Sequence, residues 1–322
     1  MKKYVLGVDG GNTKTQYYLY AADGEYVDGL RTGTCSHEQM PDGFVGCKKV
    51  IEVQINQILS RNKIKPSDLS YSVFGLAGAD FEWQKKELSK IIQSLGFANF
   101  VVDNDGYIGL KAGSPDGTGV CSINGTGTVT VGINRVGKRL QVGGIGDVSG
   151  DRGGGEYLAR RTAEAVYNNC FRCGEQTILR DMIFDAFGIK SKEDYPEAIL
   201  KILSSAENIL KINIMLAGAE KSGDKAAIKV LNNVGTELGF STAGCLRELG
   251  LDDVANIVLA GSVWVKGDYI AMLDAFKQAI SQSTTTTTKY TILKQEPAMG
   301  AVVWALESVG ILDSNTRAKL LK

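Results

Sequence analysis

The feature that most constrains this chain is an internal repeat of two strand–turn–strand segments, each turning on glycine and threonine. The first covers residues 4–20 with its turn at 9–15 (DGGNTKT), and the second covers residues 119–133 with its turn at 124–128 (NGTGT). Each segment is typical of a β-hairpin, because two β-prone runs flank a short turn. The repeat therefore predicts a duplicated architecture.

The segments that follow each hairpin also match. After the first, the patterns predict a strand near 25–30, a helix at about 42–59, a strand at 71–76, a helix near 82–95, a strand at 100–103 and a short helix after Asp105. After the second, they predict a strand at 139–142, a helix at about 154–167, a helical insertion at about 177–219, a helix near 225–249, a strand at 257–260, a helix near 268–280, a strand at 290–293 and a helix at 297–309. Each half is therefore βββαβαβα, an α/β fold on a mixed sheet.

This pattern predicts two domains. A turn near residue 117 separates the halves, and no linker rich in proline and serine lies there, so we expect domains at 1–117 and 118–322 that pack with a cleft between them. The helical insertion would belong to the second domain. We expect the last predicted helix to pack back on the first domain.

Composition excludes several function classes. The 36 Lys and Arg residues equal the 36 Asp and Glu residues, so the chain lacks the positive surplus of a dedicated nucleic-acid or anionic-membrane binder. With one histidine, His37, most histidine-dependent metal and triad chemistry is excluded unless it uses that residue. The opening apolar run is too short for a signal peptide, and no stretch is long enough to span a membrane. We therefore expect a cytoplasmic protein with reduced cysteines.

The two glycine-rich turns are the strongest candidates for a ligand site. A phosphate chain needs several backbone N–H donors at close range, and glycine removes side chains that would block them. An ordinary tight hairpin is the alternative for either turn alone, but duplication at equivalent points of one cleft favours a phosphate clamp. The candidate phosphate-binding residues are Gly10, Gly11, Asn12, Thr13, Lys14, Gly125, Thr126, Gly127 and Thr128.

Carboxylates beside these turns suggest the rest of the chemistry. Asp9 ends the first strand and suits a hard cation such as Mg²⁺, held through water; a turn-forming aspartate is the alternative. Asp103 and Asp105 lie where a strand ends and a helix begins, the edge at which α/β sheets bind ligands. We expect Asp103 to cap that helix. Asp105 is the candidate base that accepts the proton of a hydroxyl attacking a phosphoryl group.

Two further segments combine glycine with polar groups. The run at 143–157 (GGIGDVSGDRGGGEY) is too glycine-rich for a plain linker, and with Asp151 it is suited to closing around a polyol; a flexible loop is the alternative. Gly261 and Ser262 lie where another strand gives way to a helix, and they offer a surface to a nucleotide. Another strand-end glycine turn, at 75–80, is an equally weak signal of the same kind.

Taken in order, these motifs resemble the actin-like ATPase superfamily, which includes hexokinase, actin and the heat-shock chaperones. More narrowly, the chain resembles the BadF/BadG/BcrA/BcrD ATPase family, the group that contains N-acetylglucosamine kinase. The most specific pieces are residues 9–15, 105–106, 124–128, 150–155 and 261–264. The resemblance implies a first phosphate loop, a catalytic base, a second phosphate loop, a sugar-binding turn and an adenosine loop, on a duplicated ribonuclease H-like fold.

The resemblance also implies an activity. It implies an ATP-dependent, magnesium-requiring amino-sugar kinase, expected to be a homodimer, that phosphorylates the 6-OH of N-acetylglucosamine, N-acetylmuramic acid or glucosamine. Ser36 stands where acetamidosugar kinases of the family often carry Asn, and Ile145 where the best-studied relatives carry Trp. The contacts to the sugar's 2-substituent are therefore expected to differ. The implied sugar-binding residues are Ser36, His37, Gly78, Asp105, Thr126, Gly144, Ile145 and Asp151.

Two other functions fit the same resemblance. One is an activator of 2-hydroxyacyl-CoA dehydratases, which couples ATP hydrolysis to electron transfer through an iron–sulfur cluster bridged by two subunits; Cys121 with Cys170 or Cys173 would be the ligands from this chain. These cysteines lack a convincing ligand pattern, and the turn at Asp151 favours a sugar. The other is a non-catalytic sugar-sensing regulator. Such regulators usually add a DNA-binding helix-turn-helix, whereas here the first strand starts at Tyr4 and the net charge is zero.

Overall fold

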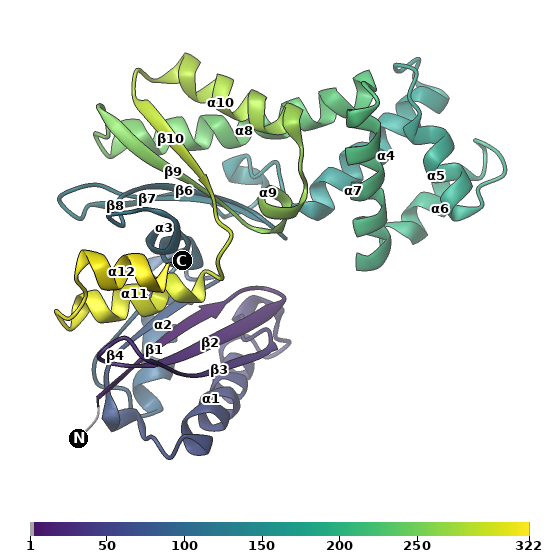
Figure 1. The fold of residues 1–322 in the computed structure, drawn as a ribbon. Coiled ribbons are helices and arrows are strands. Elements are labelled where there is room, and N and C mark those ends of the chain that lie inside the picture. Colours follow the sequence, from purple (N-terminus) through teal and green to yellow (C-terminus); the bar gives the residue numbers. More distant parts are fainter. Residues whose placement is uncertain (1–2, 322) are drawn as a thin grey trace.

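The computed structural model describes residues 3–321, and two five-stranded mixed sheets form its two lobes (Figure 1). The first sheet has the order β3-β2-β1-β4-β5 and the second the order β10-β9-β6-β7-β8. In both, the three hairpin-linked strands are antiparallel and the other two strands run parallel to the central one. The predicted duplicated βββαβαβα fold is confirmed. The strands are β1 (Tyr4–Gly10), β2 (Lys14–Ala21), β3 (Tyr26–Gly33), β4 (Leu69–Leu76), β5 (Phe100–Asp103), β6 (Gly119–Asn124), β7 (Thr128–Ile133), β8 (Arg139–Gly143), β9 (Val254–Ala260) and β10 (Thr287–Ile292).

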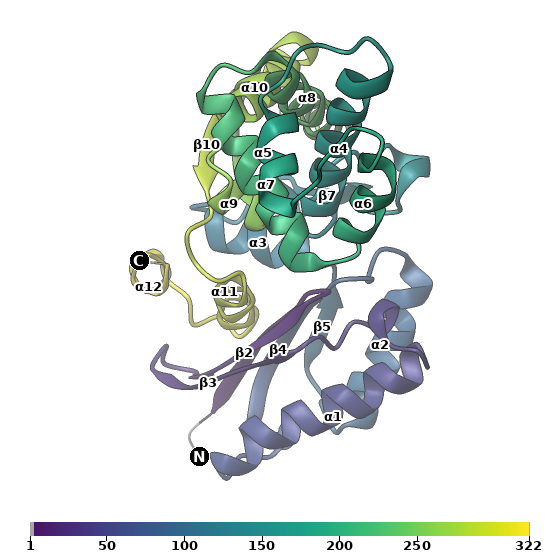
Figure 2. The same ribbon diagram turned by 90° about the vertical axis from the view of Figure 1, so that its right-hand side faces the viewer.

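Helices cover both faces of each sheet. Along β1, Leu6 and Val8 join the core under α1, whereas Val5 joins the core under α11, as the alternation of side chains along a strand requires. Figure 2 shows α1 and α11 on opposite sides of the first sheet. The helices are α1 (Phe44–Arg61), α2 (Glu82–Ser94), α3 (Asp105–Gly113), α4 (Gly155–Phe171), α5 (Leu179–Phe187), α6 (Tyr195–Ile202), α7 (Ala206–Lys221), α8 (Lys225–Glu248), α9 (Ser262–Lys266), α10 (Ile270–Ser283), α11 (Ala298–Ser308) and α12 (Ser314–Leu320), with short 3₁₀ turns at His37–Gln39, Pro66–Asp68 and Asp147–Ser149.

Two helices are exchanged between the lobes. Helix α3 follows the first sheet and packs on β6, β7 and β9 of the second as well as on β4 and β1 of the first, whereas helix α11 follows the second sheet but packs on β1 and β4 of the first. The two helices also pack on each other, and both lie between the lobes (Figures 1 and 2). Ile108 of α3 and Val302 of α11 are fully buried in one core with residues of both sheets. The start of α3 is therefore fixed by both lobes at once.

Three elements differ from the sequence-based expectation. Helix α12 was not predicted, and the helix expected to begin at Ser262 was not recognised as a separate short helix, α9, because neither is long enough to show a helical period. In the threonine-rich segment, Thr286 is buried and edge strand β10 begins at Thr287, three residues earlier than expected. Among residues 3–321, no helix combines the length and the apolarity that crossing a lipid bilayer would require.

Candidate active site

The first glycine-rich turn closes the β1–β2 hairpin and carries charge. Asp9 is 7 % exposed, and burial raises the pKa of its carboxyl to about 7; Lys14 lowers this pKa and Glu296 raises it. Lys14 Nζ lies 3.0 Å from Glu296 Oε2. Glu296 belongs to the segment between β10 and α11, so this ion pair joins the turn to the chain of the second half.

A hard cation fits this turn. Ionising a buried carboxylate is costly, and a neighbouring cation offsets that cost. The side-chain oxygen Asn12 Oδ1 is buried beside the turn without a hydrogen-bond partner among the described residues. Both groups are oxygen donors, the type that Mg²⁺ prefers.

The second turn is uncharged and is held by packing. Asn124 is fully buried, and its Oδ1 accepts a hydrogen bond of 2.7 Å from the backbone N–H of Gly154. Gly154 has φ +89°, and a Cβ there would lie 2.2 Å from the carbonyl oxygen of Thr126. Gly261 has φ +92°, and its Cβ would lie 2.5 Å from the carbonyl oxygen of Asn124. Only glycine allows this approach, which brings the second turn, the start of α4 and the candidate adenosine loop together.

The candidate base lies at the first position of α3. Asn104, not Asp103, caps this helix: its Oδ1 accepts a hydrogen bond of 2.8 Å from the N–H of Gly106. The expectation that Asp103 is the cap is wrong, because Asp103 is drawn into ion pairs with Lys85 at 2.9 Å and Arg139 at 2.7 Å. Asp105 itself is half-buried, and backbone N–H groups of Gly106 and Asp105 donate hydrogen bonds to its carboxylate.

Three carboxylates share one electrostatic environment. The pKa of Asp105 is raised to about 7, mainly by burial and then by the negative charges of Asp9 and Asp80. The pKa of Asp80 is also raised, again mainly by burial. Like charges in a poorly hydrated site disfavour one another's ionisation, which makes a carboxylate a proton acceptor near neutral pH.

The candidate sugar residues come from both lobes. A Cβ on Gly78 would lie 2.6 Å from His37 Cε1, and a Cβ on Gly144 would lie 3.3 Å from Asp80 Oδ1. The loop at residues 36–37 therefore contacts the turn after β4. That turn also contacts the loop after β8. Ser36 Oγ and His37 Nδ1 are buried without a hydrogen-bond partner among residues 3–321, which is uncommon for buried polar atoms.

The remaining candidates in this region are more exposed. Ile145 is 46 % exposed on the loop after β8. Asp151 accepts a hydrogen bond of 2.6 Å from the N–H of Gly146, so its carboxylate braces its own loop. His37 stacks on Phe44 with ring centroids 4.0 Å apart, and burial lowers the pKa of His37 while Asp80 raises it.

Sequence reasoning missed three residues at this site: Asp80, Gln141 and Glu296. Asp80 Oδ1 accepts hydrogen bonds from Gln141 Nε2 at 2.7 Å and from Asn104 Nδ2 at 2.9 Å. Asp80 ends the strand-end turn at 75–80, whose glycines were the only local signal. Gln141 and Glu296 carry no motif, because their importance comes from contacts with residues far away in the sequence.

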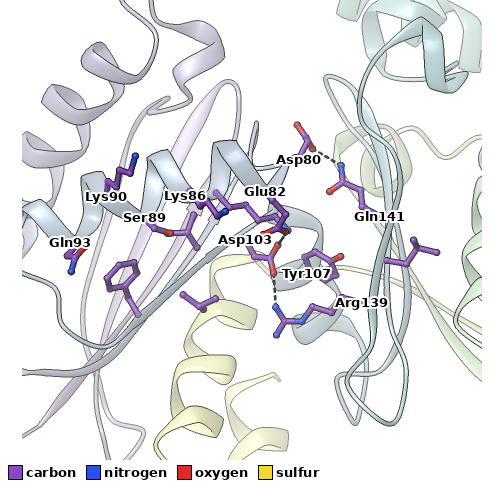
Figure 3. A pocket seen from close by; sticks show the side chains of 15 residues that line it. Asp80, Glu82, Lys86, Ser89, Lys90, Gln93, Asp103, Tyr107, Arg139 and Gln141 are labelled. Carbon is purple, nitrogen blue, oxygen red and sulfur yellow. Dashed lines mark hydrogen bonds and ion pairs between the residues drawn. The ribbon is translucent and has the colours of Figure 1, made fainter.

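A cavity of about 790 Å³ lies beside Asp80 and Gln141, between the two lobes. It is lined by α2 and β5 of the first lobe and by the start of β8 in the second. Figure 3 shows two side-chain pairs that join the lobes here: Asp80 with Gln141, and Asp103 with Arg139.

Comparison with known proteins gives the family of this chain. The model of the BadF/BadG/BcrA/BcrD ATPase family matches residues 6–305. The chain belongs to this family. It is 27 % identical over 304 residues to an N-acetylmuramic acid/N-acetylglucosamine kinase of Clostridium acetobutylicum, covering 94 % of this chain and 98 % of that protein. It is 24 % identical over 326 residues to an N-acetyl-D-glucosamine kinase of Dictyostelium discoideum, covering 95 % and 99 %.

Solved structures confirm the fold of this family member. A proposed N-acetylglucosamine kinase from Chromobacterium violaceum superposes with a TM-score of 0.68 at 20 % identity, covering 95 % of this chain and 99 % of that one. A ROK family glucokinase from Streptomyces griseus, in complex with glucose and AMPPNP, gives 0.57 at 15 % identity, covering 94 % and 98 %. Two-domain sugar kinases thus share this architecture.

The structure does not bring together the cysteines of the iron–sulfur alternative. Cys121 is fully buried in the core between the lobes, where burial and then the charge of Asp105 raise the pKa of its thiol. Cys170 lies at the end of α4, where its neighbours include Arg180 and Lys192. Among the described residues, no cluster of three or more His, Cys, Asp or Glu residues is arranged to hold a metal ion.

Proposed function

We propose that the protein is an ATP-dependent amino-sugar kinase that transfers the γ-phosphoryl of ATP to the 6-OH of N-acetylglucosamine or a related sugar, N-acetylmuramic acid or glucosamine. Relatives covering nearly the whole chain are named as kinases of N-acetylmuramic acid and N-acetylglucosamine. The observation that carries the proposal is the placement of Asp105: a half-buried carboxylate with its pKa raised to about 7, electrostatically coupled to Asp9 of the first turn.

Each ligand has a place in this proposal. The phosphates of ATP would lie between the turns at residues 10–14 and 125–128, and the adenosine beside Gly261 and Ser262. Polar groups from both lobes would face the sugar: Ser36 and His37, which keep unpaired buried atoms, and Asp151 on the opposite loop. We also propose that the enzyme is a cytoplasmic homodimer.

The proposed reaction needs one proton transfer. The sugar hydroxyl oxygen forms a bond to the γ-phosphorus while the bond to the β,γ-bridging oxygen breaks and ADP leaves; the Asp105 carboxylate accepts the hydroxyl proton. A base with a pKa near 7 is ionised at working pH and still accepts a proton effectively. Asp9 would hold Mg²⁺ through water, and that ion supplies charge neutralisation for the phosphates.

A sugar screen tests the proposal. ATP consumption is measured with glucosamine, N-acetylglucosamine, N-acetylmuramic acid, N-acetylmannosamine and glucose, and the phosphorylated position of each product is read by NMR. We expect turnover with at least one amino sugar and a 6-phosphate product. Turnover on glucose alone would move the substrate class to neutral hexoses, and turnover on none of the sugars would overturn the kinase assignment.

A further inference from the structure

Asp80 is the acceptor at which three parts of the site meet. It follows the turn after β4 and is half-buried. Its Oδ1 accepts from the amide of Gln141, on β8 of the second lobe, at 2.7 Å, and from the amide of Asn104, beside the catalytic base, at 2.9 Å. One oxygen atom therefore links the first sheet, the cap of α3 and the strand that leads into the candidate sugar loop.

The bond to Asn104 controls the start of α3. The side chain of Asn104 uses its Nδ2 for Asp80 and its Oδ1 for the N–H of Gly106. An amide that has lost its acceptor on one side is free to rotate and to leave the helix uncapped. Asp105 lies between the cap and Gly106, so the position of its carboxylate depends on this amide staying in place.

The bond to Gln141 joins β8 of the second lobe to the first lobe. Gln141 Nε2 also lies 3.2 Å from the carbonyl oxygen of Gly143, and a Cβ on Gly144 would lie 2.9 Å from the same nitrogen. A cavity of about 790 Å³ lies beside this contact, and the ion pair of Asp103 with Arg139 is a second side-chain contact between β8 and the first lobe. These two polar contacts act beside the buried core that the lobes share, and they tie the strand that leads into the candidate sugar loop to the region of Asp105 (Figure 3).

We propose that Asp80 is a positioning residue for phosphoryl transfer, which holds the cap of α3 and the sugar loop of the opposite lobe in register with Asp105. The inference rests on the proposed function, which identifies a sugar hydroxyl as the acceptor of the phosphoryl group. It assigns to Asp80 no contact with the reacting atoms. Its role is to keep the geometry in which the base and the acceptor hydroxyl meet.

Two substitutions separate this role from a general loss of structure. Asp80→Ala removes the shared acceptor, so we expect kcat to fall by roughly 10²-fold, the scale of a displacement of about 1 Å at a reacting centre. Asp80→Asn keeps an acceptor oxygen for both amides and is expected to stay within about tenfold of the wild-type kcat, since only the charge assistance is lost. The KM for ATP is expected to change by less than about threefold in both variants, because the phosphate turns are untouched.

Asp28 supplies the matched control. Its carboxylate also holds an asparagine amide, that of Asn62 at 2.5 Å, and it pairs with Arg61, but it lies on β3 five residues away from the end that meets the first turn. Asp28→Ala and Asp28→Asn should leave both kcat and KM near wild type. A third variant, Gln141→Leu, removes the hydrogen bond between Asp80 and the second lobe and is expected to lower kcat without raising the KM for ATP.

The outcomes are distinct. Loss of kcat in Asp80→Ala with rescue in Asp80→Asn supports the inference; an Asp80→Ala enzyme within twofold of wild type in kcat overturns it, as does equal loss in the alanine and asparagine variants. If Asp80→Ala does not fold by circular dichroism, Gln141→Leu decides the question. The Asp80 variants are also compared with the wild type in ATP hydrolysis without sugar. If no sugar is turned over, the proposed function is overturned, and the hydrolysis rates of the variants still decide this inference.

Discussion

The two hairpin turns occupy equivalent places in the two halves, yet they do different work. Asp9 and Asn124 both precede the first glycine of their turns, and their side chains differ by one atom type: a carboxylate oxygen in one and an amide nitrogen in the other. Asp9 carries a charge that burial makes costly. Asn124 carries none, and its oxygen accepts from the backbone N–H of Gly154 at 2.7 Å.

The difference shows how a duplicated fold divides labour. Charge concentrates on the first half, where burial and then the charges of Asp9 and Asp80 raise the pKa of Asp105. Packing concentrates on the second, where Gly154 and Gly261 hold the turn from two sides. A rigid neutral turn positions a phosphate through its backbone donors, whereas a charged turn can hold a cation and tune a base.

The exchanged helices extend the comparison. Asp105 is the first residue of α3, and Glu296 lies two residues before α11, the helix at the corresponding place of the second half. The largest effect is expected from removing the carboxylate of Asp105. Asp105→Asn is expected to lower kcat by about 10³-fold, within the range for loss of a general base, while sugar affinity stays near wild type. Single-turnover kinetics and sugar binding by calorimetry measure the two effects.

Asp105→Asn retaining more than a tenth of wild-type kcat would remove Asp105 from the base role. The matched control is Asp116→Asn, a substitution of the same kind in the turn after α3, where Asp116 accepts from Ser114 and Thr118. That variant should keep wild-type turnover.

Exchanging the two turn residues tests the comparison directly. Asp9→Asn should lower kcat/KM for ATP by about 10²-fold, because the turn loses its charge for the metal-bound phosphates, and should raise the magnesium concentration needed for half-maximal rate. Asn124→Asp should instead cost stability, by about 2 kcal/mol, because it places a charge at a fully buried position. Steady-state kinetics measure the first effect and urea unfolding the second.

If Asn124→Asp is as stable as the wild type, the division between a charged and a packed turn fails. Asn124→Ser provides the control, because serine introduces no charge. Its stability loss should be smaller than that of Asn124→Asp.

The pH dependence should reflect the charged half alone. Protonation of Asp105 removes the base, and its pKa lies at about 7, so kcat should fall as pH drops below 7, by about tenfold for each unit well below that value. The sign follows from the raised pKa: an ordinary carboxyl would stay ionised to a much lower pH. Substituting Asp9 by Asn removes a like charge and should lower the pKa of Asp105, so the fall of kcat should begin at a lower pH. A kcat that stays constant from pH 8 to pH 5 would contradict the assignment.

Much of the fold could be predicted from the sequence because its signals are local. The hairpins, the strand Phe100–Asp103 and the helix near Lys225–Leu249 follow from alternation, turn residues and helical spacing within short windows. The duplication then set the topology of both sheets. The sequence did not reveal α12, nor that the helix beginning at Ser262 is a separate short helix, α9, because both are too short to show a helical period.

The candidate site also contains residues with a local sequence signal and residues without one. Asp105 and the two turns stand out locally, as a carboxylate after a buried strand and as glycine-rich loops. Asp103 looked like a helix cap, but its partners Lys85 and Arg139 come from other elements. Asp80 and Gln141 are 61 residues apart, and only the packing of the two lobes brings their side chains to 2.7 Å.

The smallest expected effect concerns the ion pair at the first turn. Lys14 and Glu296 are each more than a third exposed, so the pair contributes little to stability. Binding of ATP phosphates would compete with Glu296 for Lys14, and Glu296→Gln removes that competitor together with a charge that raises the pKa of Asp9. We expect the KM for ATP to fall by about twofold with kcat unchanged. Glu87→Gln, which breaks the exposed pair of Glu87 with Lys90 on α2, should change neither. A KM that rises in Glu296→Gln would mean that Glu296 itself assists nucleotide binding, and that the second half also supplies charge to the site.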